Sequence, residues 1–348
     1  MRGGAGTWAL VAYLAVGVAR AQEPAPNPPT AVARLSDAAE AMEYWDVAAQ
    51  LDSGHRFFAR FLITNEGPGA HTAAAVGHLV LPDGSITPIK YGRAREGWQL
   101  SPDRRRLKIA SAVLDLSQPL WRVDIDSDTN GFKVLLQLSR AAAPVSTEPL
   151  PGAYWVDVVT PTPAHGTVWL RGMAAPLPVE GTVALTHTRM ERNEADLVQR
   201  RAELFASAGD LGVYLADLTL ADGRHRGTLI VCDDTGVRYR SDDLPVIFGE
   251  ALTAPGDRAY PVPARWQFDT PEVRGAVRLE REWLRWAPLD LVPQPFRFLL
   301  SLRAAPQLVW ADAGLDLDLG ANGAGGAPKV QGGHGVALVA LARPAVER

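Results

Sequence analysis

The chain has 348 residues, 47% of them hydrophobic, and a formal net charge of −4 at pH 7. This composition allows a substantial core, and it excludes the strong overall positive charge that favours nucleic-acid binding. A single cysteine, Cys232, excludes an intramolecular disulfide and is interpreted as a small buried residue, so stability must come from packing.

The N-terminus has the pattern of an export signal. Arg2 supplies the positive end, residues 9–18 a short apolar run and residues 19–21 a small-x-small cleavage site. Residues 1–21 are therefore predicted to be a signal peptide, which places the mature protein in the periplasm or outside the cell. The next segment, 22–34, is rich in Pro and Ala and is predicted to be an extended tether.

The remainder is dominated by short strand-like segments separated by Asp-Gly, Asn-Gly, Glu-Gly and Pro-rich turns. In residues 55–64, Phe58 and Leu62 interrupt the alternation of apolar and polar side chains, as expected of a strand covered on both faces. Such regular short strands predict an all-β protein built from antiparallel barrels or sandwiches. The predicted strands are residues 73–81, 107–116, 121–125, 132–138, 154–159, 167–170, 182–188, 211–220, 228–232, 264–268, 273–286, 296–302, 307–310 and 335–341, besides 55–64.

One stretch favours a helix. Asn193 can cap it, Asp196 stands three residues later as in a capping box, and Leu197, Arg201, Leu204 and Phe205 fall near one helical face.

A short repeated sequence pattern suggests two similar halves. Residues 79–84 and 218–223 share the pattern L-x-L-x-D-G, and each is followed by another strand-like run. The two prolines of residues 172–180 favour a boundary there. We therefore predict an N-terminal barrel over residues 35–175 and a C-terminal barrel over residues 176–348.

Common catalytic and cofactor signatures are absent from the sequence. It contains no G-x-S-x-G elbow, phosphate-binding loop, H-E-x-x-H motif or Cys/His cluster. The glycine-rich residues 320–329 fit a flexible hairpin loop, because no helix follows them to hold a phosphate. We predict neither a metal ion nor a cofactor.

His187 is the first candidate functional residue. On a strand over residues 182–188 it faces the same side as Val183 and Leu185, and Arg189 continues that side. A barrel with this interior would hold an imidazole and a guanidinium in an apolar cavity. A core histidine satisfied by hydrogen bonds explains the pattern equally well.

Tyr214 is the second candidate. It shares a strand face with Ala216, whereas Asp217 lies on the opposite face. A phenol in an apolar pocket can donate a hydrogen bond to a ligand or accept one. The alternative is an ordinary amphipathic barrel residue.

These residues resemble the carotenoid 1,2-hydratase (hydroxyneurosporene synthase) family of two-barrel, lipocalin-like proteins. The resemblance rests on residues 43–65 (EYWDVAAQLDSGHRFFARFLITN), on the glycine-led strand that ends at His187, and on the strand that carries Tyr214. It implies two lipocalin-like barrels, to which the sequence adds one short helix, and the addition of water to a double bond of a long polyene. It also implies a His-x-Trp and a Tyr-x-Asp pair, which His187 and Tyr214 match; Arg189 stands at the tryptophan position, and Asp217 is displaced by one residue beyond Ala216.

The resulting hypothesis is an exported protein that binds a hydrophobic small molecule, such as an isoprenoid, lipid or polyketide, at a barrel mouth or between the barrels. His187, Tyr214 and Asp217 are the candidate catalytic residues, and Arg189, Leu185 and Ala216 the candidate ligand contacts. Activity would be of a cofactor-independent hydratase, isomerase or cyclase type, with a buried carboxylic acid as proton source. Peripheral membrane association is compatible with this hypothesis. A non-catalytic structural or interaction protein of the cell envelope is the alternative.

Overall fold

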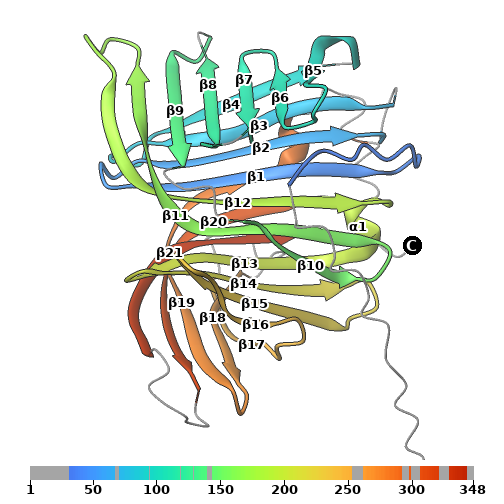
Figure 1. The fold of residues 1–348 in the computed structure, drawn as a ribbon, viewed down its shortest axis with the longest axis vertical. Helices are drawn as coiled ribbons and strands as arrows, with labels where there is room; N and C mark the ends of the chain where they lie inside the picture. Colours follow the sequence, from blue (N-terminus) through green and yellow to red (C-terminus); the bar gives the residue numbers. More distant parts are fainter. Residues whose placement is uncertain are drawn as a thin grey trace, which may run out of the picture.

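The computed structural model describes residues 31–342 except 67–69, 94, 118, 128, 139–142, 253–261, 292–297, 299–305 and 321–328. The described chain forms two antiparallel sheets with one short α-helix between them, and the sheets stack along the long axis of the molecule (Figure 1). The all-β prediction is confirmed: one sheet is a nearly closed barrel and the other a half-barrel. No helix among the described residues is long and apolar enough to cross a membrane.

The first sheet has twelve strands, in the order β4-β3-β2-β1-β12-β11-β9-β8-β7-β6-β5, with β10 paired to β11. Its elements are β1 (Met42–Leu51), β2 (Arg56–Thr64), β3 (Thr72–Val80), β4 (Ile86–Arg93), the 3₁₀ helix η1 (Arg95–Gly97), β5 (Trp98–Leu100), β6 (Arg106–Ile109), β7 (Ala112–Asp115), β8 (Arg122–Ser127), β9 (Phe132–Leu138), β10 (Val145–Leu150), β11 (Tyr154–Leu170) and β12 (Leu177–Met190).

The second sheet has nine strands, in the order β16-β15-β14-β13-β21-β20-β19-β18-β17. The helix α1 (Glu194–Leu197) precedes it, and its elements are β13 (Val198–Ala208), β14 (Leu211–Leu220), β15 (His225–Asp233), β16 (Gly236–Ser241), β17 (Ile247–Leu252), β18 (Val262–Asp269), β19 (Val273–Trp286), the 3₁₀ helix η2 (Pro288–Leu291), β20 (Gln307–Leu319) and β21 (Lys329–Leu341).

The two sheets repeat one topology. Each begins with four consecutive antiparallel strands, and its last strand returns to pair with its first, as β12 does with β1 and β21 with β13. The repeated L-x-L-x-D-G pattern, however, covers the β3–β4 turn in the first sheet and the β14–β15 turn in the second. These are the third hairpin of the first sheet and the second hairpin of the second sheet, so the two sequence patterns do not occupy equivalent positions. The evidence for duplication is therefore the shared topology and not the sequence pattern.

Along the sequence, the division between the two sheets follows β12 and so lies beyond the predicted boundary at residues 175–176. β12 pairs with β1 and β11 of the first sheet, and the second sheet begins with β13. The proline-containing stretch at residues 172–180 forms the turn and first residues of the β11–β12 hairpin, in which Leu177 opposes Val168. Prolines that suggested a linker are therefore turn and strand-start residues.

Two local predictions need correction. Residues 31–34 of the predicted tether are packed rather than free, because Ala31 and Ala33 are buried against the first core. The predicted helix is a single turn: Asn193 caps it by accepting a hydrogen bond from the Ala195 amide at 2.8 Å, but Arg201, Leu204 and Phe205 lie on β13. Pairing of β13 with β14 and β21 on both sides outweighs the local helical pattern. The predicted signal peptide, residues 22–30 and most of the predicted strand 296–302 lie outside the described residues.

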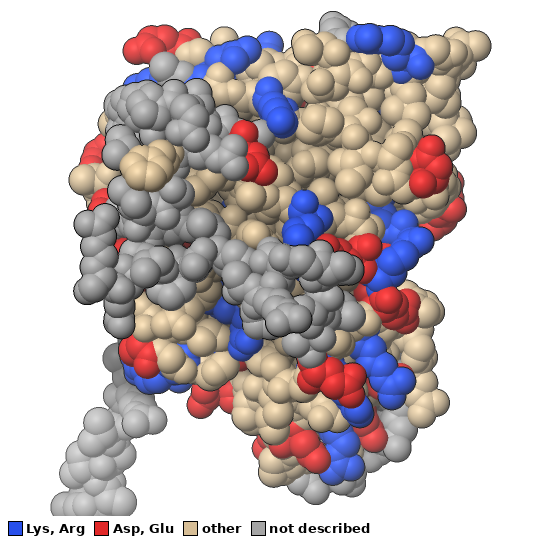
Figure 2. Space-filling model, turned by 180° about the vertical axis from the view of Figure 1, so that it is seen from behind, with Lys and Arg blue, Asp and Glu red and all other residues tan. Residues whose placement is uncertain are grey.

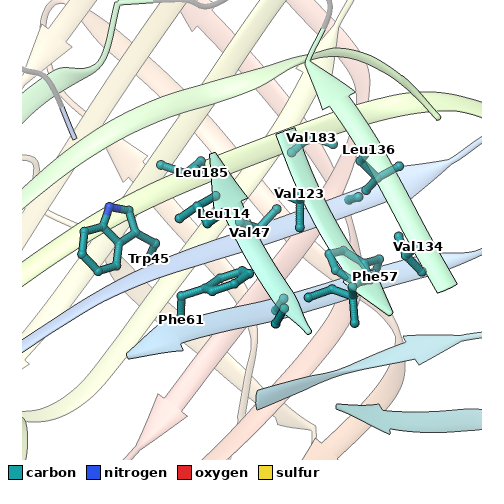
Figure 3. Close-up of a cluster of buried hydrophobic side chains, with 14 of the residues drawn as sticks. Trp45, Val47, Phe57, Phe61, Leu114, Val123, Val134, Leu136, Val183 and Leu185 are labelled. Atoms are coloured by element: carbon teal, nitrogen blue, oxygen red, sulfur yellow. The ribbon is translucent and has the colours of Figure 1, made fainter. Parts of the chain in front are cut away.

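The interior of the first barrel is filled by apolar side chains that alternate along its strands. Figure 3 shows Trp45, Val47, Phe57, Phe61, Leu114, Val123, Val134, Leu136, Val183 and Leu185 converging from opposite walls. A second cluster, including Trp266 and Phe268, fills the concave side of the half-barrel.

A third cluster lies between the two sheets. Side chains on the outer faces of both sheets form it, and among them Phe58 and Trp310 have ring centroids 4.5 Å apart. Strands such as β2 are therefore covered on both faces, as the broken alternation of residues 55–64 predicted. Several polar side chains on these outer faces, among them Asp46, Arg201 and Glu203, are buried where the sheets meet.

Candidate functional site

His187 lies inside the first barrel, on the face of β12 that carries Val183 and Leu185, as the alternation predicted. It is wholly buried between two carboxylates: Nε2 lies 2.7 Å from Glu43 Oε1 and Nδ1 lies 3.1 Å from Asp157 Oδ2. Its partners are thus carboxylates rather than backbone groups.

The charges around His187 stabilise one another. Burial alone would lower the pKa of His187, but the hydrogen bonds and charges of Asp157 and Glu43 outweigh burial and raise it. Burial alone would raise the pKa values of Glu43 and Asp157, yet the contact with His187 lowers both. The group therefore favours an imidazolium between two carboxylates.

The N-terminal segment covers this end of the barrel. The amides of Arg34 and Leu35 donate to the Glu43 carboxylate, at 2.9 and 2.8 Å, and Trp45 Nε1 donates to the carbonyl of Ala31 at 2.9 Å. With this segment in place, His187 has no exposed surface.

Arg189 continues the His187 face toward the end of the barrel. It is half-buried, and its guanidinium carbon lies 5.4 Å from the centre of the Trp155 ring. Arg189, Glu43 and Arg34 line a small pocket of about 30 Å³. The structure thus brings His187, Leu185 and Arg189 to one barrel interior, where Leu185 packs in the core.

Tyr214 lies in a different place, in the cluster between the two sheets, and Ala216 belongs to the same cluster. The Tyr214 hydroxyl donates to Glu203 Oε1 at 2.8 Å. The carboxyl partner of this phenol therefore comes from the neighbouring strand β13 instead of from Asp217.

Asp217 faces the concave side of the half-barrel. It is buried, and its carboxylate lies 3.1 Å from His225 Nδ1 and 3.7 Å from a guanidinium nitrogen of Arg200. Burial raises the pKa of Asp217, although His225 and Arg200 oppose the increase. His187, Tyr214 and Asp217 consequently lie in three separate parts of the molecule.

Sequence reasoning missed a group of charged side chains between the sheets. Arg60 of β2 makes a bidentate ion pair with Asp46 of β1, with both nitrogen–oxygen distances 2.6 Å. Arg201 of β13 is 2% exposed; its guanidinium nitrogens lie 3.1 Å from Glu203, 3.4 Å from Glu194 and 3.8 Å from Asp46. We call Asp46, Arg60, Glu194, Arg201 and Glu203 the inter-sheet charge cluster.

When every group is ionised, the two arginines and three carboxylates give this cluster a net charge of −1. Burial raises the pKa of Glu203, Arg201 lowers it, and the nearby Asp46 and Glu194 raise it further. Burial likewise raises the pKa values of Tyr44, Tyr154 and Tyr214, so these phenols remain neutral donors. Protonation of Glu203 would bring the cluster to neutrality.

A pocket of about 240 Å³ opens beside this cluster. Most of its wall is apolar, and Arg60, Glu194 and Arg201 contribute to one side. The lining residues are Met42, Arg60, Leu62, Glu66, Asn193, Glu194, Ala195, Val198, Gln199, Arg201, Pro288, Leu289, Pro306, Leu308, Ala340, Leu341 and Ala342. Apolar walls with a few polar groups are typical of small-molecule sites.

Glu194 is the most exposed member of the cluster, with a side chain 23% accessible. The capped turn of α1 places it at the pocket, and Asn193 is itself fixed by a hydrogen bond to Glu66. The hydroxyls of Tyr44 and Tyr154 donate to its Oε1 atom, at 3.1 and 3.4 Å, and Arg201 Nε lies 3.4 Å from the same atom. One carboxylate oxygen is thus held by two hydroxyl donors and one ion pair.

The sequence carried a partial signal for this cluster. Because residues 55–64 predicted a strand covered on both faces, Arg60 could have been placed in a buried environment. The helix prediction hid the roles of Arg201 and Glu203. In a strand these two residues and Phe205 lie on the same face, because side chains repeat every two residues, whereas in a helix Glu203 points away from the other two. Among the described residues, no group of three or more His, Cys, Asp and Glu side chains has an arrangement that could hold a metal ion.

Comparison with known proteins identifies the fold. No protein-family model and no curated protein sequence matches the chain. A structure from Nitrosomonas europaea, provisionally described as AttH, has 12% sequence identity and a TM-score of 0.61 over 86% of this chain and 92% of its own. Kievitone hydratase from Nectria haematococca has 7% identity and a TM-score of 0.57, over 90% and 97%. CghA has 11% identity and a TM-score of 0.58, over 89% and 90%.

These similarities span most of each chain and confirm the resemblance at the level of fold. The protein shares the overall fold of these three structures, with one sheet as a nearly closed barrel and the other as a half-barrel.

Proposed function

We propose that this protein binds a hydrophobic small molecule in the pocket between the two sheets and performs cofactor-independent acid–base chemistry on it through Glu194. The observation that carries the proposal is the pocket itself: an apolar cavity that meets a buried charge cluster on one side. Kievitone hydratase, a protein of the same fold, supports chemistry of the hydratase type. Export, indicated by the N-terminal sequence, would place this activity outside the cytoplasm.

The positions of the other candidates support indirect roles for them. His187 is sealed inside the first barrel, so it holds the barrel end together and does not contact the ligand. Tyr214 acts indirectly, by donating to Glu203 behind Arg201. The filled interior of the first barrel also favours a site between the sheets over a site within that barrel.

Acid–base chemistry needs a carboxylate whose geometry is fixed and which can reach the ligand. Glu194 meets both conditions, because two tyrosine hydroxyls and the Arg201 guanidinium hold its Oε1 atom and its side chain borders the pocket. The two phenols and the guanidinium stabilise the carboxylate, as charge-assisted hydrogen bonds and ion pairs do.

The test begins with the protein purified from its own host. Organic extraction followed by mass spectrometry should recover a retained hydrophobic compound. Ala340→Phe, which fills the pocket, should remove that compound, whereas Val237→Phe at an exposed position of β16 should retain it. Equal amounts of the compound in wild type and Ala340→Phe would show that it binds elsewhere.

A further inference from the structure

One side of the pocket presents an open acceptor. Among the described residues, the Glu194 carboxylate contacts Tyr44, Tyr154 and Arg201, in each case through its Oε1 atom. Its second oxygen, Oε2, has no partner among the described residues, and the side chain borders the pocket. A ligand can therefore donate a hydrogen bond to Oε2.

The same side presents an open donor. Arg60 uses Nε and Nη2 to bind Asp46, and its planar guanidinium lies over the Tyr44 ring with the carbon 4.0 Å from the ring centre. Its third nitrogen, Nη1, makes no hydrogen bond within the described part of the chain, and Arg60 also borders the pocket. A ligand can therefore accept a hydrogen bond from Nη1.

We infer that the ligand of this pocket is an apolar alcohol, whose hydroxyl group donates to Glu194 Oε2 and accepts from Arg60 Nη1 while its hydrocarbon part lies along the apolar wall. This inference rests on the proposed function and adds the chemical class of the ligand. A hydroxyl is both a donor and an acceptor, and so matches both open groups.

Other polar head groups match less well. A ketone or aldehyde can accept from Arg60 but leaves Glu194 Oε2 without a donor. A carboxylate would stand beside Glu194 and near Asp46 and Glu203, in a cluster that already has more acidic than basic groups. A hydrocarbon leaves both open groups unpaired, which is costly in an apolar pocket.

The farnesyl series tests this ranking, because farnesol, farnesal, farnesoic acid and farnesene share one hydrocarbon chain and differ at its end. Isothermal titration calorimetry of the full chain should show farnesol binding about tenfold more tightly than farnesal, with farnesoic acid and farnesene weaker still.

The substitution Glu194→Gln gives a sharper test. The amide oxygen of Gln can accept from the two tyrosine hydroxyls that now donate to Oε1, which leaves the NH₂ group to face the pocket. Farnesol should then lose about tenfold in affinity while farnesal does not, so the preference for the alcohol disappears. Glu180→Gln, at an exposed position away from the pocket, should keep the wild-type preference.

The outcomes separate this inference from the function on which it rests. Equal affinities for the four compounds, abolished by Ala340→Phe, would overturn the alcohol assignment and leave the pocket as the binding site. Retention of the alcohol preference in Glu194→Gln would also overturn it. Binding that Ala340→Phe does not weaken would overturn both proposals.

Discussion

The imidazole ring of His187 lies parallel to the indole ring of Trp45, with an interplanar angle of 1° and ring centroids 4.5 Å apart. The two residues are directly opposite each other in the β1–β12 pairing. In this stack, the two ring nitrogens of His187 contact Glu43 and Asp157.

Replacing His187 with Gln should destabilise the protein strongly. The substitution leaves Glu43 and Asp157 buried without their cation, and loss of one partner of a buried ion pair costs roughly 3–5 kcal/mol. Urea unfolding at pH 6 would measure the difference. A loss below about 1 kcal/mol would show that the carboxylates are satisfied without the imidazolium.

The same group predicts a pH dependence. The pKa of His187 is raised above 6.5 by folding, so its contribution is full below pH 6.5 and is lost as pH rises through the folded-state value. The pKa values of Glu43 and Asp157 are lowered from 4.5 and 3.8, so their contribution is present above those values and is lost as pH falls. The melting temperature of wild type relative to His187→Gln should thus be greatest near pH 6 and should decline on both sides. A difference that is constant with pH would contradict an imidazolium at this position.

The inter-sheet charge cluster predicts unequal effects of two substitutions. Arg201→Met removes the cation nearest to Glu203 and Glu194 and should cost roughly 3–5 kcal/mol of unfolding free energy. Glu203→Gln should cost less, because burial already raises the pKa of Glu203 and a Gln oxygen can still accept from Tyr214. Denaturant unfolding of both variants checks the order; a more severe effect of Glu203→Gln would reverse our interpretation.

Two ion pairs offer a matched comparison of burial. Arg56 of β2 binds Asp312 of β20 in a bidentate pair between the two sheets, at 2.6 and 2.8 Å, whereas the pair of Arg274 and Asp269 is exposed. Arg56→Lys should lower stability by about 1–2 kcal/mol, because Lys cannot reproduce the bidentate contact. Arg274→Lys should change it by less than about 0.5 kcal/mol. Thermal unfolding would compare them, and equal effects would argue against a role of the inter-sheet pair.

The close approach of β21 to β13 gives a further test. A Cβ atom at Gly335 would lie 2.1 Å from the carbonyl oxygen of Phe205, which is backbone and cannot move aside easily, whereas a Cβ at Gly249 would meet nothing within 4 Å. Gly335→Ala should destabilise the protein by about 2 kcal/mol or more through overpacking, and Gly249→Ala should be close to neutral. Melting temperatures of the two variants decide the point, and a stable Gly335→Ala protein would place these strands farther apart.

On the face that Figure 2 shows, the charged side chains of the described residues form no grouping comparable to the buried ion pairs. Seen from behind, basic and acidic side chains are interspersed over the lower half of the molecule, and broad uncharged areas lie over the upper half (Figure 2). The charges on which the predictions above mainly rest are buried, inside the first barrel and between the sheets.

The sequence by itself determined the class of fold and the inward direction of single side chains. Strands are visible locally because side chains alternate with a period of two, and that period correctly placed His187 beside Leu185 and set Asp217 opposite Tyr214. It also showed that the strand of Phe58 is covered on both faces.

Only the tertiary structure decided which of these side chains meet. The β12–β1 pairing brings His187 to Glu43 across more than a hundred residues, and the stacking of the two sheets brings Arg201 of β13 to Asp46 of β1. Alternation fixes the face of a strand but not the partner of that face, because partners are set by strand order and sheet packing. For this reason the sequence predicted a site built on His187, Tyr214 and Asp217, whereas the pocket formed around Glu194, Arg60 and Arg201.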